Sequence, residues 1–131
     1  MATLGFAEAF AKYGAKLKNV NWSVCAAAAD GSLAVSVWQH HIRKDGDALV
    51  CRDTMERWTG PGKNELREKL AIALATKQPI SLVIATTTKP DLVDAGGDAS
   101  KIPKSFQVRE DLVGHVTLLD GEKFAITITR R

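Results

Sequence analysis

Residue types that bind anions gather in one short segment, Arg57-Trp58-Thr59-Gly60-Pro61-Gly62-Lys63-Asn64. Arg57 and Lys63 supply positive charge, and the two glycines allow the backbone to approach a ligand closely. A helix is predicted to begin here, and the free amide groups of a helix's first turn attract anions. Trp58 adds an aromatic ring that can stack on a nucleic-acid base. The segment therefore predicts a phosphate-binding loop.

The same segment also has a purely structural interpretation. It lacks the Gly-x-x-x-x-Gly-Lys-Ser/Thr pattern of a P-loop, since only Gly-x-Gly-Lys-Asn is present, so nucleotide hydrolysis is not indicated. Gly60-Pro61-Gly62 can simply break the chain before a capped helix, with Trp58 packed as a loop anchor. The sequence leaves both interpretations open.

Trp38 and His40 form a second candidate surface for a planar ligand. The alternation of apolar and polar residues places both side chains on the polar face of a predicted hairpin, near Ser36. A ring in that position can stack on a base. The alternative is that a helix covers this face and makes Trp38 part of the core, since small residues such as Cys25 and Ala34 surround it.

The histidines and cysteines do not follow the spacing of a known metal site. His40 and His41 are adjacent, and adjacent side chains of a regular strand point to opposite faces, so one ion cannot easily contact both. Cys25 and Cys51 do not form a Cys-x-x-Cys pair, and the chain has no His-Glu-x-x-His motif. We therefore expect no metal and no other cofactor.

The patterns expected of catalytic sites are equally weak. A nucleophilic hydrolase needs a Ser or Cys against a His, but the predicted register separates Cys25 from His40, and no Gly-x-Ser-x-Gly elbow occurs. A Mg²⁺-dependent nuclease needs converging acidic residues and a lysine. Two such sets can be formed, neither with a supporting motif: Asp120 with Glu122 and Lys123, and Asp53 with Glu56 and Lys63. The sequence favours a binding module over an enzyme.

The composition is that of one folded domain, residues 1–131. Apolar residues make up 45% and charged residues 25%, which excludes wholesale disorder. The net charge of +3 permits an anionic partner without requiring one. No apolar run approaches the roughly 20 residues of a membrane span, and 1–18 carries charges where a signal peptide has its apolar centre. We therefore expect a cytoplasmic protein with reduced cysteines and no membrane partner.

Two main helices are predicted to position the candidate residues. The first covers 4–17, where Phe6 and Phe10 begin an apolar face with helical spacing. The second covers 64–77 and ends before Pro79.

A β-hairpin is predicted between these helices, over residues 20–40. Asp30-Gly31 is a strong hairpin turn signal between two alternating runs. A two-residue turn there pairs Val24 with Val37, and it places the core face of both strands on the same side. A charged loop then leads to a short strand over 48–52.

The remaining chain is predicted to form a buried strand, a long loop and a closing hairpin. The strand covers 80–86, and the loop covers 87–104 with one helical turn at 90–93. The hairpin joins 113–119 to 123–129 through a three-residue loop, which predicts a shared apolar face of Gly114, Val116, Leu118, Phe124, Ile126 and Ile128.

These elements predict an α+β fold with about six strands and two main helices. So many short strands in 131 residues leave exposed edges unless the sheet curls. We therefore expect a strongly curved, mostly antiparallel sheet or a small, partly closed barrel.

The layout, with a Trp in a Gly-rich loop ahead of a helix and a hairpin at the end, resembles small barrel modules of the PUA-like kind. That resemblance lies in the order of the helices and strands alone, so no functional residue is assigned from it. It implies that the protein recognises bases of RNA or modified bases of DNA. Together with the basic and aromatic residues, it favours a nucleic-acid-binding module in which Arg57 and Lys63 contact phosphate while Trp38 or Trp58 stacks on a base. The alternative is a protein-interaction or inhibitor module that acts through the hairpin edge and the 87–104 loop.

Overall fold

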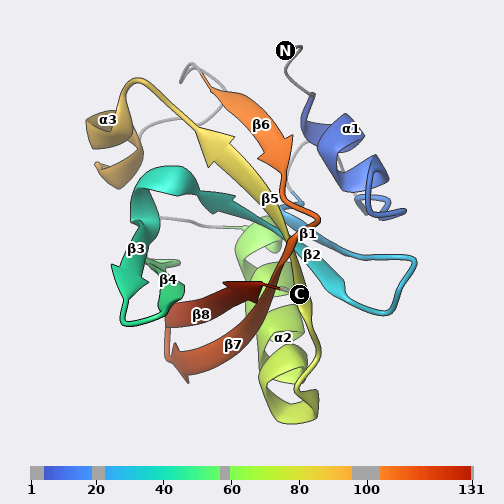
Figure 1. Cartoon of the computed structure of the whole chain (residues 1–131). Coiled ribbons are helices and arrows are strands. Elements are labelled where there is room, and N and C mark those ends of the chain that lie inside the picture. The colour runs from blue at the N-terminus through green and yellow to red at the C-terminus, as the bar shows by residue number, and fades with distance from the viewer. Residues whose placement is uncertain (1–4, 19–22, 57–59, 96–103, 131) are drawn as a thin grey trace.

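The β-branched and alternating runs of the chain form eight strands in one sheet (Figure 1). The structure, a computed structural model, describes residues 5–18, 23–56, 60–95 and 104–130. The strands are β1 (Cys25–Ala27), β2 (Leu33–Trp38), β3 (Ile42–Asp45), β4 (Ala48–Thr54), β5 (Ile80–Thr86), β6 (Ser105–Val108), β7 (Leu112–Asp120) and β8 (Lys123–Arg130).

The order of the strands is β1-β2-β5-β7-β8-β4-β3, and β6 pairs with β5 outside this path. The sheet is mixed, because β2 and β5 run parallel while the other pairs are antiparallel. The α+β class is confirmed. The sheet is not closed, so the predicted barrel is not confirmed.

The helical segments are α1 (Phe6–Ala11), the 3-10 turn η1 (Gln39–His41), α2 (Pro61–Thr76) and α3 (Pro90–Asp94). Helix α1 is shorter than predicted, because the chain turns at Gly14 with a φ of +69°. Helix α2 begins three residues before the predicted start of 64, since Pro61 takes the first helical position, which suits its fixed φ.

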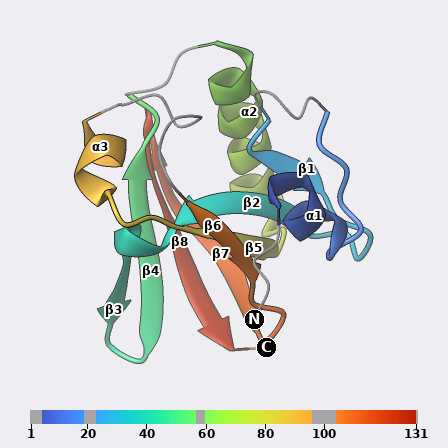
Figure 2. The same ribbon diagram turned by 90° about the horizontal axis from the view of Figure 1, so that it is seen from above.

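Helices α1 and α2 cover opposite faces of the β1-β2-β5 part of the sheet (Figures 1 and 2). Leu66 and Leu70 of α2 pack into the main core, which also contains Leu82 of β5. Phe10 of α1 packs on the other face, in a cluster with Val83. Strand β5 is therefore buried on both faces, as its continuous apolar run predicts.

The β1–β2 hairpin is one residue out of the predicted register. Cys25 pairs with Val35, so Val24 and Val37 are not partners. The amide of Ala28 donates a hydrogen bond to the carbonyl of Ser32 at 2.9 Å, which leaves a loop of three residues rather than the predicted two. Asp30 closes this loop by accepting hydrogen bonds from the amide and hydroxyl groups of Ser32 at 2.9 and 2.6 Å. Because helices cover both faces here, burial does not select one register as it does in a half-exposed hairpin.

The β7–β8 hairpin follows the predicted register only away from its turn. Gly114 pairs with Ile128 as predicted, but Asp120 pairs with Lys123, which leaves a two-residue turn. A bulge between Val116 and Leu118 shifts the pairing by one residue between these two parts of the hairpin. It turns the side chain of Leu118 outward, where it is 47% exposed. The predicted core position of Leu118 is therefore wrong.

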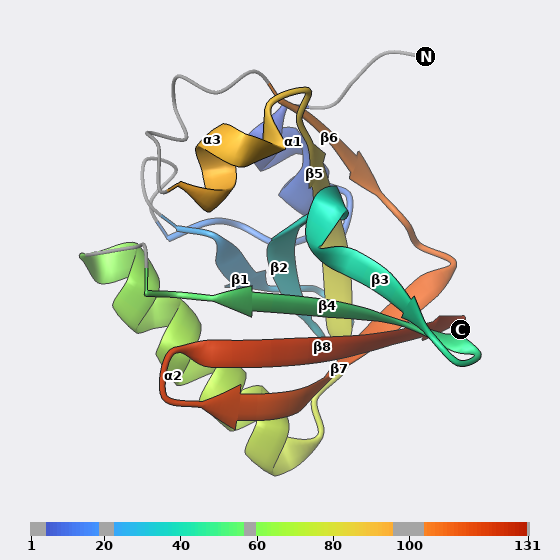
Figure 3. The ribbon, with the colours of Figure 1, turned by 90° about the vertical axis from the view of Figure 1, so that its left-hand side faces the viewer.

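The charged loop predicted before β4 is largely a strand. Residues Ile42–Asp45 form β3, which pairs with β4 through a turn at Gly46. Turn η1 links β2 to β3 and lies near α3 and β4 (Figure 3). This arrangement brings together side chains from three distant parts of the sequence.

Candidate functional site

The predicted phosphate-binding segment lies at the start of α2, and the structure describes only its second half. Arg57, Trp58 and Thr59 lie outside the described residues, so their predicted contacts stay predictions. Gly60 precedes the helix with a φ of +93°, a conformation that favours glycine. Gly62 is buried in the first turn. The prediction that a helix begins at this Gly-Pro-Gly segment is confirmed.

Lys63 is engaged within the protein. Its ammonium group forms an ion pair with Glu122 in the β7–β8 turn, and Arg67 reaches the same carboxylate at 3.0 Å. The contact with Lys63 is the main cause that lowers the pKa of Glu122 below its usual value. The charge of Lys63 is therefore already compensated before any ligand binds.

A groove with a volume of about 530 Å³ lies beside the start of α2. Asn64, one of the predicted contact residues, lines it together with Lys69 of α2 and with Lys16 and Lys18 from the segment after α1. Within the described part of the chain, none of these three lysines forms an ion pair. We call this surface the lysine groove.

Trp38 and His40 lie side by side at the end of β2, and neither lines the lysine groove. Their ring centres are 6.0 Å apart, and the planes make an angle of 48°. Trp38 is half-buried and belongs to neither core cluster. Part of its ring is thus accessible. The predicted contact residues therefore divide between two places, the start of α2 and the end of β2.

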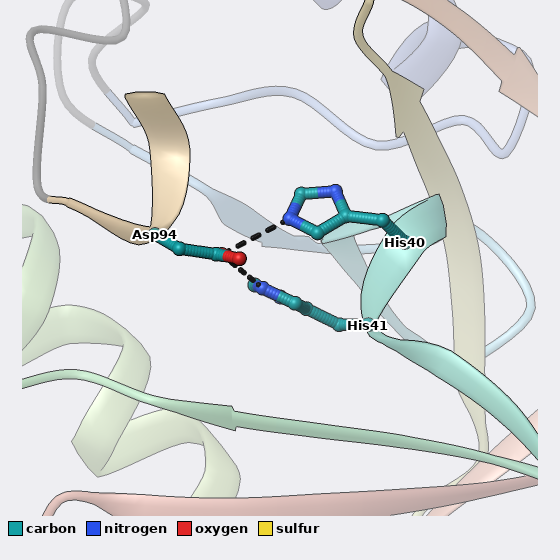
Figure 4. Close-up of side chains that lie close together, drawn as sticks. All are labelled: His40, His41 and Asp94. Carbon is teal, nitrogen blue, oxygen red and sulfur yellow. Dashed lines mark hydrogen bonds and ion pairs between the residues drawn. The ribbon is translucent and has the colours of Figure 1, made fainter. Parts of the chain in front are cut away.

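The expectation that His40 and His41 point apart is wrong, because these residues do not lie in a strand. Strand β2 ends before them, and they belong to the 3-10 turn η1. Their ring centres are only 4.1 Å apart. Both side chains reach Asp94 at the end of α3, with Nε2 of His40 at 3.1 Å and Nε2 of His41 at 2.8 Å from the same Oδ1 atom (Figure 4). We call these three residues the histidine cluster.

Asp53 of β4 approaches His41 from the opposite side of its ring. Oδ2 of Asp53 lies 3.2 Å from Nδ1 of His41, and the Asp53 side chain is only 5% exposed. Nδ1 is buried and makes no well-aligned hydrogen bond to the described residues, so this contact is mainly electrostatic. Asp53 is the main cause that raises the pKa of His41, and Asp94 adds to it, while partial burial opposes both.

A shallow groove of 450 Å³ opens next to the histidine cluster. His41 and Asp94 form part of its wall, and Arg52, Lys123 and Leu118 form other parts. The cluster is thus not sealed in the core. A small ligand or ion can reach it from solvent.

Both cysteines lie inside the protein. Cys25 and Cys51 are free and buried, and burial is the main cause that raises the pKa of each thiol from 9.0 to about 12. Both thiols are therefore protonated at neutral pH, where the thiolate would be the reactive form.

The two residue sets considered for a nuclease, neither of which had a supporting motif, have members in contact with residues outside their own set. Lys63 of one set pairs with Glu122 of the other, and Asp53 lies beside His41 instead.

Sequence reasoning did not assign a role to Asp94 or to the lysines of the lysine groove. The signal for Asp94 was indirect: the 87–104 loop is longer than most connections, and a helical turn was predicted within it. That turn is α3, and its last residue is Asp94. The lysines at 16 and 18 follow a helix and carry no motif of their own.

Comparisons of the chain with protein-family models, with curated proteins and with solved structures find no significant match. The resemblance to PUA-like modules therefore stays a prediction. Among the described residues, no helix combines the length and apolar character needed to cross a membrane.

Proposed function

We propose that this protein is a small nucleic-acid-binding module and that its lysine groove contacts the phosphate backbone. The observation that carries this proposal is the convergence of Lys16, Lys18 and Lys69 on one groove without ion-pair partners in the described chain. Lysines without an ion-pair partner can contribute strongly to the affinity for a nucleic acid, because each phosphate that they neutralise releases condensed counterions.

The position of Asn64 in the same groove supports the proposal. Its side-chain amide can donate a hydrogen bond to a phosphate oxygen, a contact that positions nucleic acid without reading its sequence. Glu65 and Glu68 also line the groove and reduce its net positive charge. We therefore expect weak, salt-sensitive binding that depends on only a few phosphate contacts.

Base contacts form the second part of the proposal. Trp38, half-buried beside His40, offers a partly accessible ring on which a base can stack. Trp58 is the other proposed stacking residue. Reading of a base in the manner of PUA-like modules is the more specific form of this proposal.

The test is binding of labelled single-stranded DNA, duplex DNA and RNA over a series of salt concentrations, followed by fluorescence anisotropy. The groove variant replaces Lys16, Lys18 and Lys69 with Gln. A control variant replaces Lys12, Lys44 and Lys89, which are exposed and lie outside the groove. Both variants lose the same formal charge.

We expect the groove variant to bind more than about tenfold more weakly and to reduce the slope of log K against log salt by about 2, since each phosphate contact contributes roughly 0.7 to 0.9. The control should keep most of the affinity and the slope. Equal effects of the two variants would show that only overall charge matters and would contradict the groove assignment.

A protein partner is the second candidate. Strand β1 lies at one end of the sheet order, so a strand from another protein can pair with its outer edge. The 87–104 loop would add contacts. If the wild-type protein binds none of the three nucleic acids, this candidate becomes the better one, and cross-linking through a photoreactive group placed at Ala27 would test it.

A further inference from the structure

We propose that the histidine cluster binds a divalent first-row transition metal through His40, His41 and Asp94, with Asp53 orienting His41. The inference concerns a different site from the lysine groove, because the two share no lining residue. It is independent of the nucleic-acid proposal.

The proton positions on His41 provide the first argument. A neutral imidazole carries a proton on one nitrogen and a lone pair on the other. Nε2 of His41 faces Asp94 at 2.8 Å, and Nδ1 faces Asp53 at 3.2 Å. In the neutral ring, whichever nitrogen carries the proton, the lone pair of the other one points at a carboxylate oxygen, which is repulsive, so the pair of carboxylates favours a cation here, either a second proton or a metal ion.

A cation at Nε2 removes this conflict. The metal would accept the Nε2 lone pair, and the proton would then sit on Nδ1, directed at Asp53. A carboxylate behind a metal-bound histidine is the usual way in which proteins set its tautomer and ring orientation. Asp53 is 5% exposed and already lies where such a carboxylate is needed.

The approach of the two rings is the second argument. The ring centres of His40 and His41 are 4.1 Å apart, so protonation of both would place two positive charges in contact. The same Oδ1 atom of Asp94 faces Nε2 of each ring. One shared cation between two neutral imidazoles and a carboxylate satisfies all three groups at once.

The spacing of the ligand atoms is suitable for a metal ion. One nitrogen or oxygen from each of the three side chains lies within 4.8 Å of the other two. Ligand atoms bound tetrahedrally at about 2.0–2.1 Å stand about 3.3 Å apart. The observed separations of 2.8 and 3.1 Å to Asp94 are within about half an ångström of that value.

The donor set indicates the class of ion. Imidazole nitrogens favour Zn²⁺, Fe²⁺, Ni²⁺ or Cu²⁺, whereas Mg²⁺ and Ca²⁺ prefer oxygen ligands alone. Two histidines and one carboxylate leave at least one coordination position for water or a ligand. Because His41 and Asp94 line the 450 Å³ groove, that position is accessible from solvent.

The fold fixes the two histidines of the cluster but leaves the carboxylate of Asp94 free to move. Val93, next to Asp94, is buried and anchors α3 to the body of the protein. The Asp94 side chain itself is 53% exposed, whereas those of His40 and His41 are 22% and 13% exposed. The two imidazoles are thus prepositioned, and Asp94 can move to complete the site.

The experiment is titration of the full chain, stripped of metal with a chelator, with Zn²⁺ in a calorimeter and with Co²⁺ by visible absorption. We expect saturation by a single ion and a Co²⁺ spectrum without the intense sulfur-to-metal band of a thiolate site. Asp94→Asn and His40→Gln should each weaken binding by at least about tenfold, and Asp53→Asn should weaken it by roughly tenfold.

The matched controls are Asp91→Asn, in the same helix, and His115→Gln, an exposed histidine on β7. Both should bind Zn²⁺ as the wild-type protein does. Asp94 is exposed, so its variant is expected to stay folded, which circular dichroism checks. The proposal is overturned if the wild-type protein binds none of these ions saturably, if Asp94→Asn and His40→Gln bind as tightly as wild type, or if only the cysteine variants Cys25→Ser and Cys51→Ser lose binding.

Discussion

Lys63 of α2 and Glu122 of the β7–β8 turn form an ion pair that ties the start of the helix to the sheet. Arg67, about one helical turn later, binds the same carboxylate at 3.0 Å. The backbone carbonyl of Glu122 also accepts a hydrogen bond from the amide of Met55 at 2.8 Å. A residue expected to contact phosphate therefore holds two elements of the fold together.

Replacing Lys63 with Gln should lower the melting temperature at pH 7 and leave nucleic-acid affinity within about a factor of two. The pKa of Glu122 is lower in the folded protein than its usual 4.5. Its stabilising effect is therefore present above that value and lost as the pH falls through the folded pKa. Calorimetry should show a smaller difference between wild type and variant at pH 3. A large loss of affinity at unchanged stability would contradict this structural role.

Gly114 should not tolerate a side chain. A Cβ atom there would lie 2.7 Å from Cγ2 of Ile126 and 3.2 Å from Cβ of Ile80, because β5 and β7 meet at this residue. We expect Gly114→Ala to lower the free energy of unfolding by about 1–3 kcal/mol. Urea denaturation measures this, with His115→Ala at the exposed neighbouring position as the control. If Gly114→Ala and His115→Ala were equally stable, the close contact between β5 and β7 at Gly114 would not limit side-chain size, and the prediction would be wrong.

The hydroxyl group of Tyr13 should contribute to stability by joining three parts of the chain. It donates a hydrogen bond to the carbonyl of Leu82 in β5 at 2.7 Å and accepts one from the amide of Arg109 at 3.2 Å. Tyr13→Phe removes both bonds and should cost about 1–2 kcal/mol, since the carbonyl loses a partner in a part-buried place. Denaturant unfolding tests the value, and an unchanged midpoint would show that water replaces the hydroxyl.

The two thiols should react slowly with alkylating reagents in the folded protein. Their ionisation should also lower the free energy of unfolding at alkaline pH. Burial raises the pKa of Cys25 and Cys51 from 9.0 to about 12, so the unfolded chain loses these protons at lower pH than the folded protein. The free energy of unfolding should therefore fall as the pH rises above about 9. Iodoacetamide labelling at pH 8, compared with protein in guanidinium chloride, measures reactivity. Equal rates in the two states would contradict the burial of the thiols.

Zinc should raise the thermal stability of the wild-type protein if the histidine cluster binds it. Binding to the folded state at about one hundred times the dissociation constant stabilises by roughly 2.7 kcal/mol. Asp94→Asn should lose most of this shift, and excess EDTA should reverse it in the wild type. Equal shifts in both proteins would assign the stabilisation to another site.

Local sequence patterns predicted several elements correctly. The continuous apolar run predicted β5 with its observed bounds, 80–86, because a strand buried on both faces needs no polar positions. Helical spacing and the Gly-Pro-Gly break located α2 to within a few residues. The β7–β8 register around Gly114 was also predictable, although the bulge near Leu118 was not.

The candidate sites were predicted only in part. Trp38 and His40 do lie together, and Asn64 does face a groove. The histidine cluster was missed because a strand was assumed where the chain forms a 3-10 turn, and hydrophobic periodicity does not reveal a turn of three residues.

The sequence by itself determined where helix α2, strand β5 and most of the β7–β8 hairpin form, because side-chain periodicity and turn residues act over short distances. Only the tertiary structure decided which charged and titratable groups meet. Asp94 lies 53 residues from His41 along the chain, and Glu122 lies 59 residues from Lys63. Such contacts depend on how helices and strands pack against one another, and the spacing of residues within a short segment does not reveal that packing.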